Sequence, residues 1–496
     1  MRSALLLLAV VQVATSEASV SEAFAVDFLQ RRLEIGKELK RPNILLFIAD
    51  DQGWAGLGAH RTDKGEEEAQ GKAETQTPTM DNLIREGILL ERHYTSSQSA
   101  PARSSLLSGR LPSHCWPGKP EGVSNAQMFW NRSDNVSGFL GIPRNMTAFP
   151  RKLQEVGYAT HYVGKWDAGY ATPEHTPLGR GYDSFLGFLQ GGIDAWTKGH
   201  GKVTDDVVLD VCLNKFRDFS LYNASYRARV GHQVARELGC NVRASLGKPL
   251  FVNATGCLDS NISLCWPESC YADEMLLKYA AKIIRTHDSK KQLFLTYASR
   301  SVHSAMEVPA AYMQRLDDMV AQTGVARALP WTLQRKEMAA LQLHMDTVLG
   351  KLILAFKDKG MYDNLLIVYL SDNGGGVNLY ENGNNYPLKS GKYTDWEGGV
   401  RTNAFIGGGA VPVEKRGSTF NGVIHISDWY ATLCTLAGAD YVDHAAEEAN
   451  KILRAQQLPL LAPVDSRPQW QHIMLGTSVV IALTAGCRVW FALDCL

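Results

Sequence analysis

The feature that most limits how this chain can fold is a series of apolar segments that alternate with helical ones. Four segments, NILLFI, GYATHYVGKW, QLFLTYAS and NLLIVYLS, are expected to be strands. Between them, residues 272–285 and 338–356 carry apolar side chains every three or four positions, which is typical of amphipathic helices. This alternation predicts an α/β fold, with a large, mostly parallel sheet flanked by helices on both faces.

Polar side chains stand where these strands end, and there are six of them: Asp50, Asp51, Lys165, His303, Asp372 and Asn373. In parallel sheets ligands bind beyond the carboxyl ends of the strands, so we expect these groups to share one site. The three carboxylates and the amide oxygen are hard oxygen donors, which suit one Ca²⁺ per chain, with Mg²⁺ second, rather than zinc.

The stretch SSQSAPARSSLLSGR, residues 96–110, has the form of a nucleophile loop. Pro101 interrupts the chain, and Arg103–Ser108 can form a helix that ends near Gly109. A residue just ahead of a helix N-terminus faces free N–H donors and the positive end of the dipole, which suits Ser99 as a nucleophile toward an anionic ester. The planar guanidinium of Arg103 can hold both the nucleophile and the anionic group of the ester. The alternative is an ordinary serine-rich loop.

The N-terminus predicts a secretory signal peptide over residues 1–18, because a positive residue, a short apolar run and small residues follow one another. A buried N-terminal helix is the alternative. Six N-x-S/T sequons indicate a glycoprotein: Asn131, Asn135, Asn145, Asn223, Asn253 and Asn261. Five of nine cysteines fall within residues 212–270, which indicates disulfides. The expected location is extracellular or lysosomal, reached by the secretory pathway.

Charge and hydropathy narrow the range of partners. Lys plus Arg and Asp plus Glu number 51 each, so the chain has no overall field to gather nucleic acid. The apolar tail, residues 476–496, is interrupted by Arg488, which makes it a poor membrane span, and no membrane association is expected. Residues 63–74, DKGEEEAQGKAE, have no apolar periodicity and are expected to form a solvated loop.

The serine-rich stretch resembles the sulfatase signature C/S-x-P-x-R-x-x-L-x-x-G-R, which is met by Ser99, Pro101, Arg103, Leu106, Gly109 and Arg110. Further blocks, among them LSDNGG and HISDWYATLCTLAG, keep the family's order across residues 42–438, and the pattern is most similar to arylsulfatases of the B/I/J type. The resemblance implies an alkaline-phosphatase-like catalytic domain over 42–438. It also implies that residues 439–496 are a truncated form of the smaller C-terminal domain.

The resemblance further implies hydrolysis of sulfate esters, on a sulfated small molecule or glycan. The implied calcium ligands are Asp50, Asp51, Asp372 and Asn373, joined by formylglycine that a maturase makes from Ser99. Arg103 holds the hydrated aldehyde, and Lys165, His303 and Lys392 contact the ester. These roles are chemically sensible, because a divalent cation and two lysines offset developing negative charge and His303 can protonate the leaving oxygen.

Three features depart from the family pattern. Ser99 stands where eukaryotic sulfatases have cysteine, the residue on which their maturase acts. Asp167 replaces the histidine of the familiar GKWHLG block and is a candidate base. Only 58 residues follow Gly438, too few for the family's C-terminal domain. Two alternatives therefore stay open: a phosphatase or phosphodiesterase that uses an unmodified serine, and an inactive sulfatase fold that binds sulfated glycans.

Overall fold

A nine-stranded sheet runs through the protein in the order β5-β4-β3-β6-β1-β7-β8-β2-β9. The computed structural model describes residues 41–61, 65–115, 141–170, 172–196, 212–213, 268–325, 332–378 and 381–477. The central strands all run parallel and are β4 (Ser184–Phe188), β3 (Ala159–Lys165), β6 (Leu293–Ala298), β1 (Asn43–Ala49) and β7 (Leu365–Ser371). The predicted α/β fold with a large, mostly parallel sheet is confirmed.

The remaining strands lie toward the two edges of the sheet. On one side β8 (Ala404–Gly407) runs antiparallel between β7 and β2 (Ile88–Tyr94), and β9 (Ser418–His425) runs parallel to β2. On the other side β5 (Cys212–Leu213) pairs antiparallel with β4. Every residue of β1, β6 and β7 is buried, as expected for strands covered on both faces, whereas β9 alternates between buried and more exposed residues.

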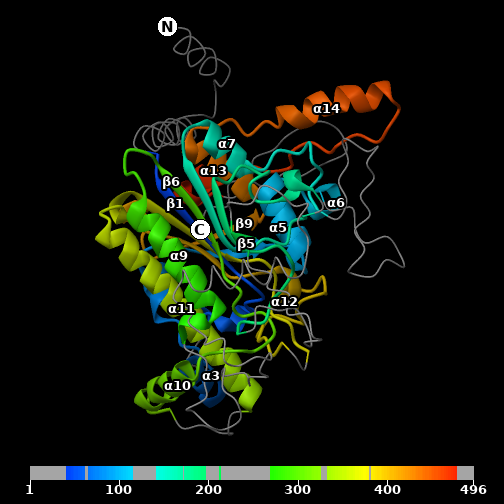
Figure 1. The fold of residues 1–496 in the computed structure, drawn as a ribbon. Coiled ribbons are helices and arrows are strands. Elements are labelled where there is room, and N and C mark those ends of the chain that lie inside the picture. Colours follow the sequence, from blue (N-terminus) through cyan, green and yellow to red (C-terminus); the bar gives the residue numbers. More distant parts are fainter. Residues whose placement is uncertain are drawn as a thin grey trace, which may run out of the picture. The chain divides into compact units, whose positions relative to one another are not determined.

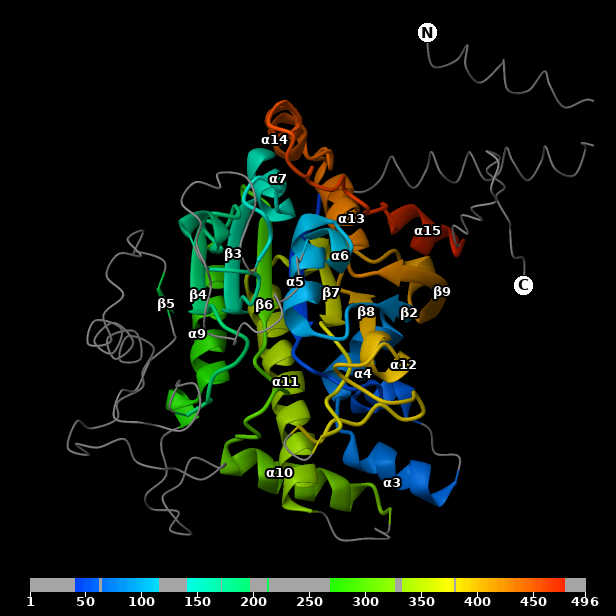
Figure 2. The same cartoon turned by 90° about the vertical axis from the view of Figure 1, so that its right-hand side faces the viewer.

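Helices cover both faces of this sheet (Figures 1 and 2). One layer contains α4 (Pro78–Arg85), α9 (Ala272–Thr286) and α11 (Leu333–Asp358), with α10 (Ala310–Gln322) packed on α11. The other contains α5 (Ser99–Ser108), α6 (Pro112–Cys115), α7 (Phe149–Glu155) and α13 (Asp428–Ala437). Within the described residues, α11 alone is long and apolar enough to cross a membrane, and 72% of its most apolar window is buried inside the protein. It is a core helix here.

The predicted loop at residues 63–74 is wrong, because Glu66–Glu74 forms a helix, α3. Three glutamates occupy its first turn, where the positive end of the helix dipole favours them. Two arginines from outside the helix then fix it, since Arg61 pairs with Glu68 at 3.2 Å and Arg335 with Glu74 at 2.7 Å. These ion pairs to arginines outside the helix hold it against the rest of the protein, although its sequence has no apolar stripe.

The described part of the C-terminal segment packs against the end of α5. It contains α14 (His444–Ala455) and α15 (Trp470–Leu475). The backbone N–H groups of Asp465 and Ser466 both donate to the carbonyl of Gly109, at 2.9 Å, just past the end of α5. The Ser466 hydroxyl accepts from the N–H of Ala431 in α13 at 2.8 Å. The segment thus closes the end of α5 that lies away from Ser99.

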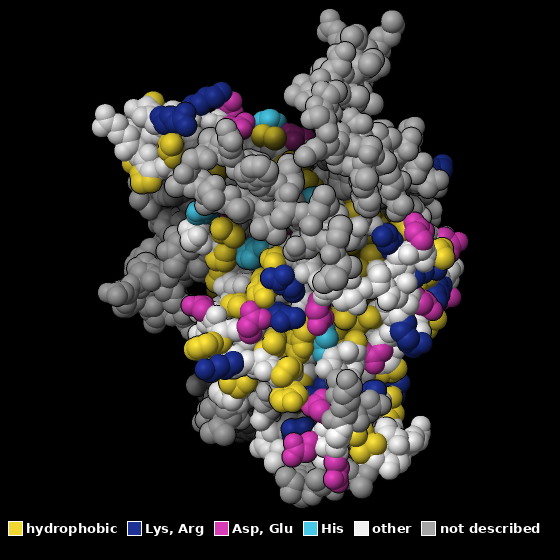
Figure 3. Space-filling view, turned by 180° about the vertical axis from the view of Figure 1, so that it is seen from behind, with side chains coloured by type: hydrophobic (Ala, Val, Ile, Leu, Met, Phe, Trp, Pro, Cys, Tyr) yellow, Lys and Arg dark blue, Asp and Glu magenta, His cyan; other side chains and the backbone are white. Residues whose placement is uncertain are grey.

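Several predictions fall wholly or largely outside the described residues. They are the signal peptide, every sequon except Asn145, the apolar tail and most of the cysteine cluster. Asn145 lies half-buried in a turn, Cys270 is buried, and Cys115 and Cys434 are buried free thiols. On the face drawn in Figure 3, cationic, anionic and apolar side chains lie interspersed, as the balanced composition suggests.

Candidate active site

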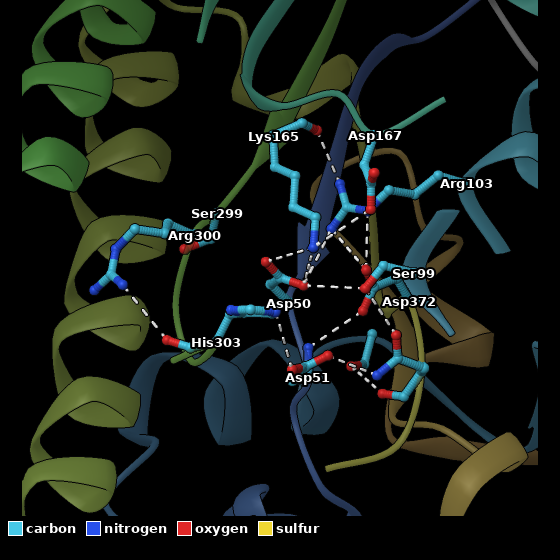
Figure 4. Close-up of polar contacts among 12 residues, drawn as sticks. Asp50, Asp51, Ser99, Arg103, Lys165, Asp167, Ser299, Arg300, His303 and Asp372 are labelled. Atoms are coloured by element: carbon cyan, nitrogen blue, oxygen red, sulfur yellow. Dashed lines mark hydrogen bonds and ion pairs between the residues drawn. The ribbon is translucent and has the colours of Figure 1, made fainter. Parts of the chain in front are cut away.

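The four predicted oxygen ligands meet at the carboxyl end of the sheet (Figure 4). Neighbouring strands β1 and β7 are paired with Ala49 opposite Ser371, so the residues that follow each strand leave the sheet side by side. The backbone N–H of Asp51 donates to Asp372 Oδ1 at 3.2 Å, and the side-chain amide of Asn373 donates to Asp51 Oδ1 at 2.7 Å. All four side chains, including that of Asp50, are buried. Strand register therefore explains why two motifs 322 residues apart share one site.

Three cations from three different elements face these carboxylates. Lys165, at the end of β3, places Nζ 2.8 Å from Asp50 Oδ1. Lys392, in the loop after β7, places Nζ 2.6 Å from Asp51 Oδ2. Arg103, from α5, forms a two-point contact with Asp372 Oδ2, at 2.9 Å from Nε and 2.8 Å from Nη2. The formal charges of these six side chains balance, three against three, and all six side chains are buried.

Burial and these cations pull the carboxylate pKa values apart. Burial raises the pKa of Asp50 to about 6, against the opposing effect of Lys165, and the nearby Asp372 carboxylate pushes in the same direction as burial. Burial also acts to raise the pKa of Asp372, but Arg103 and Lys165 outweigh it, so this pKa lies well below the usual range. The pKa of Asp51 is lowered as well, since His303 and Lys392 overcome its burial. Of these three carboxylates, Asp50 is the one whose pKa is raised, because its burial outweighs the effect of Lys165.

Ser99 lies within reach of this carboxylate cluster. Its Oγ donates to Asn373 Oδ1 at 3.0 Å and lies 3.5 Å from Asp50 Oδ1. The helix begins at Ser99, four residues earlier than the sequence suggested, because Pro101 falls in the first turn, where a missing N–H costs nothing. Ser99 is therefore in the first turn and not ahead of it. Arg103 lies one turn further on and also donates to the carbonyl of Lys165 at 2.9 Å.

His303 and Asp167 line the same site from the loops after β6 and β3. His303 Nδ1 lies 2.6 Å from the carbonyl of Ser304, so Nδ1 carries the hydrogen and Nε2 is the nitrogen that faces Asp51 Oδ2, at 3.7 Å. Asp167 Oδ2 lies 3.8 Å from Lys165 Nζ. Asp51 and Asp167 both have left-handed backbone, with φ of 62° and 47°, a conformation that non-glycine residues adopt mainly at functional sites.

The residues present fit a hard divalent cation. The candidate ligand atoms of Asp50, Asp51 and His303 all lie within 4.8 Å of one another. Asp372 and Asn373 are joined to Asp51 by hydrogen bonds. Burial raises the pKa of Asp50 even though Lys165 lies beside it, and the neighbouring Asp372 carboxylate adds to this effect, so a further cation at this position would be stabilising. The geometry adds one group to the predicted oxygen set, since the imidazole of His303 borders the same cluster.

Sequence reasoning missed a buried arginine that holds the His303 loop. Arg300 donates to the carbonyls of His303 and Ala305 at 3.4 and 3.1 Å, and to that of Glu307 at 3.2 Å. Its Nε lies 3.5 Å from Asp273 Oδ2 in α9 (Figure 4 shows the contact to His303). No spacing in the sequence links Asp273 to Arg300, and the one available signal was a charged residue directly after an apolar strand. Glu381, whose carboxylate lies 3.7 Å from Lys392 Nζ, was also missed, because no spacing in the sequence links these two residues.

Fold and site together define an α/β protein whose mostly parallel sheet ends in a buried carboxylate cluster that could hold a metal ion, with the hydroxyl of Ser99 and three positive side chains beside it. A family model described as Sulfatase matches residues 42–439. The chain therefore belongs to the sulfatase family.

Individual relatives agree with this assignment. Arylsulfatase J of Mus musculus is 28% identical over 397 residues, which is 80% of this chain and 52% of that protein. N-acetylgalactosamine-6-sulfatase of Homo sapiens is 24% identical and covers 73% of this chain. The chain spans about half the length of these relatives, 52% and 56%. The crystal structure of Ps i-CgsB with k-i-k-neocarrahexaose matches with a TM-score of 0.58 and 25% identity, over 88% of this chain and 77% of that one.

Proposed function

We propose that this protein hydrolyses sulfate monoesters at the centre described above. The observation that carries the proposal is the position of Ser99, whose hydroxyl lies in the first turn of α5 and 3.0 Å from Asn373, among buried carboxylates and cations. A nucleophile there can reach an ester whose anionic group is held by the lysines. Family membership and the names of the relatives support the same reaction.

The cation we propose is Ca²⁺, held by Asp50, Asp51, Asp372 and Asn373 together with the oxygen of residue 99. When bound, this ion withdraws charge from the sulfate and from the attacking oxygen. Lys165 and Lys392 supply the positive charge that the remaining sulfate oxygens require, and Arg103 holds the nucleophile from the helix. His303 Nε2, which faces the centre, donates the proton that the leaving oxygen needs.

We propose that a maturase oxidises Ser99 to formylglycine, passing the two electrons and two protons that the alcohol loses to that enzyme's own electron acceptor. The hydrated aldehyde supplies two hydroxyls, one that attacks sulfur and one whose deprotonation releases sulfate as the aldehyde forms again. Asp167, 3.8 Å from Lys165, is the proposed acceptor of that second proton. An unmodified serine has a single hydroxyl, so its sulfated form would need attack by water to turn over.

The wider setting is part of the same proposal. The substrate is a sulfated small molecule or glycan, and the protein is a disulfide-containing glycoprotein of the secretory route, either extracellular or lysosomal. The structure of Ps i-CgsB is that of a complex with k-i-k-neocarrahexaose, which favours glycans over small esters as the first substrates to assay.

The first test is the mass of the tryptic peptide HYTSSQSAPAR, His93–Arg103, from protein purified from its native host. Oxidation of the serine alcohol to an aldehyde removes H₂ and lowers the mass by about two daltons. Fragment ions should place the loss on Ser99 and not on Ser96 or Ser97. Sulfate release from 4-nitrophenyl sulfate by the same material is expected to disappear in Ser99→Ala and to persist in Ser96→Ala.

An unmodified Ser99 in active native protein would contradict the formylglycine mechanism. Turnover of phosphate esters but not of sulfate esters by such protein would instead support the serine phosphatase alternative. Retention on a sulfated glycan with no turnover of either ester would support the inactive, glycan-binding alternative.

A separate test concerns the ion. Calorimetric titration of chelator-treated protein with Ca²⁺ is expected to show one site, bound more tightly than Mg²⁺, because three carboxylates and an amide suit the larger ion's flexible coordination. Asp372→Asn should weaken Ca²⁺ binding at least tenfold. Asp465→Asn, which alters a carboxylate near the far end of α5, is the matched control and should leave the titration unchanged. Equal binding by both variants would exclude this site.

A further inference from the structure

An exposed aromatic loop adjoins the proposed active site. Residues 386–396 carry three large aromatic side chains with more than half of their surface in solvent, namely Tyr386 (57%), Tyr393 (58%) and Trp396 (55%). The same loop carries Lys392, whose ammonium pairs with Asp51 inside the centre. Exposed aromatic side chains gathered beside a buried site often mark a ligand-binding surface.

Tyr393 is held close to residues of the centre by its own backbone. Its N–H donates to the carbonyl of Ser97, two residues before the nucleophile, at 2.8 Å. Lys392 Nζ lies 5.1 Å from the centre of the Tyr393 ring. The φ of Tyr393 is 69°, a left-handed value that a bulky side chain adopts at a conformational cost. The chain therefore accepts strain to present this ring to solvent next to a lysine of the site.

The loop is fixed rather than loosely attached. The side chain of Asn385 donates to the carbonyls of Gly375 and Ser390 at 2.8 and 3.0 Å, and accepts from the N–H of Gly375 at 2.9 Å. The N–H of Gly398 donates to the carbonyl of Lys389 at 2.9 Å. The bonds between Asn385 and Gly375 tie the start of the loop to the segment that follows Asp372, and the bond between Gly398 and Lys389 closes the loop on itself, so the backbone that carries the aromatic residues keeps its place.

Charges around Trp396 are compatible with a sulfated, hydroxyl-rich ligand. Lys389 Nζ lies 4.0 Å from the centre of the Trp396 ring and is exposed. The carboxylate of Glu397 accepts from the Tyr94 hydroxyl at 3.1 Å and pairs with Arg401 at 3.3 Å, which reduces its repulsion of anions. Asp395 is exposed and can accept hydrogen bonds from ligand hydroxyls.

We propose that Tyr393 and Trp396 form a carbohydrate subsite, so that the substrate is a sulfated sugar chain and not a compact aryl sulfate. The C–H face of a pyranose ring is apolar and slightly positive, and it stacks on the negative face of an aromatic ring. With a sulfate in the centre, the neighbouring sugar rests on Tyr393 and Trp396. Lys389 then lies in reach of a second sulfate. This inference rests on the proposed sulfatase activity.

The test is the substrate preference of aromatic-loop variants. We would measure kcat/KM for 4-nitrophenyl sulfate and for tetrasaccharides from chondroitin sulfate and from carrageenan. Wild-type protein is expected to prefer at least one tetrasaccharide. In Tyr393→Ala and in Trp396→Ala, the ratio of kcat/KM for that tetrasaccharide to kcat/KM for the aryl sulfate should fall about tenfold, as expected for the loss of one aromatic contact of about 1.4 kcal/mol.

Two control variants make the result specific. Tyr393→Phe keeps the ring and should keep the ratio, whereas Tyr441→Ala removes an exposed tyrosine, 37% in solvent, from the segment before α14 and should not change it. A preference of the wild type for the aryl sulfate, or an unchanged ratio in both alanine variants, would overturn the inference.

Failure of the proposed function gives a different pattern. If native protein hydrolyses no sulfate ester, the sulfatase proposal fails, and the subsite is tested by electrophoresis in gels that contain chondroitin sulfate or carrageenan. Retardation of the wild type that is lost in Tyr393→Ala and in Trp396→Ala supports the subsite. Equal migration of all variants in both gels overturns it.

Discussion

The buried guanidinium of Arg300 is the side chain that most directly fixes His303. It bonds three carbonyls of the loop that carries His303 and pairs with Asp273 at 3.5 Å. A lysine has no planar fork and cannot keep these contacts together. We expect Arg300→Lys to lower kcat about 10- to 100-fold with a smaller change in KM, the range typical of residues that orient a catalytic group.

A positioning role has a signature that simple destabilisation lacks. Because His303 is the proposed acid, Arg300→Lys and Asp273→Asn should both shift the pH dependence of kcat on the limb set by that group. Arg285→Lys, an exposed arginine at the end of α9, is the control and should match wild type. A fall in the amount of folded protein with an unchanged pH profile would show that Arg300 acts on folding alone.

Asp167 permits a second prediction at the same scale. Its carboxylate is 21% exposed and 3.8 Å from Lys165, so it can exchange protons with solvent while staying in the site. Asp167→Asn keeps the shape but cannot accept a proton. We expect kcat for sulfate release to fall about 100-fold, at the lower end of general-base effects, while Asp167→His retains most of the activity. Full activity of Asp167→Asn would remove Asp167 from the mechanism.

Sequence reasoning works for site residues that follow a strand and fails for those fixed by a partner elsewhere. Asp50 and Asp372 could be placed because the carboxyl ends of adjacent parallel strands meet, and β1 and β7 are adjacent. Arg300 and Asp273 could not be paired, because their contact depends on how α9 packs on the sheet. Tyr393 is a similar case, since its exposure depends on tertiary bonds to Ser97.

Among the helices, α4 is capped by a residue from another helix. Asp346, in the middle of α11, accepts from the N–H groups of Thr79 and Met80 at 3.1 and 2.8 Å. This carboxylate is buried, and burial raises its pKa from 3.8 to about 6. The folded protein thus binds this proton more tightly than the unfolded chain does. The resulting stabilisation is complete below about pH 4 and is lost as the pH rises through about 6.

That shift predicts a difference between two unfolding curves. The free energy of unfolding of the wild type, relative to Asp346→Asn, should fall by about 2 kcal/mol between pH 4 and pH 7, since most of the shift from 3.8 to about 6 is expressed in this range at about 1.36 kcal/mol per pKa unit. Urea titrations at several pH values measure it. Asp358→Asn, an exposed aspartate at the end of the same helix, should run parallel to the wild type. A difference for Asp346→Asn that does not vary with pH would contradict the raised pKa.

Element by element, the sequence was sufficient wherever periodicity was strong. The helices at 272–286 and 333–358 and the strands β1, β6 and β7 were expected within a few residues. The segment that forms α3 was not, because its helix depends on ion pairs to Arg61 and Arg335 and has no apolar stripe. The early start of α5 was missed because Pro101 was taken as a break, although proline is tolerated in a first turn.

At the level of the whole molecule, a buried ion pair joins the C-terminal segment to the residues that follow α5. Asp443, the N-cap of α14, lies 2.8 Å from Arg110 just beyond α5, and both side chains are almost inaccessible, at 3% and 0%. Its carboxylate also accepts from the N–H and hydroxyl of Thr147, at 2.9 and 2.7 Å. Three separate segments thus depend on one carboxylate. Composition gave no indication of this arrangement.

Removing that carboxylate should weaken the whole assembly. Asp443→Ala leaves Arg110 as a buried, unpaired charge, which typically costs at least about 3 kcal/mol, and it also removes the cap of α14. Lys451→Ala is the control, because Lys451 pairs with Glu448 on the same helix with 69% of each side chain exposed, and such pairs contribute about 0–1 kcal/mol. Both would be measured by urea unfolding and by sulfate release. We expect Asp443→Ala to lose stability and activity together, because Gly109 and Arg110 follow the helix that begins at Ser99. Loss of stability without loss of activity would show that α5 holds the nucleophile independently of the C-terminal segment.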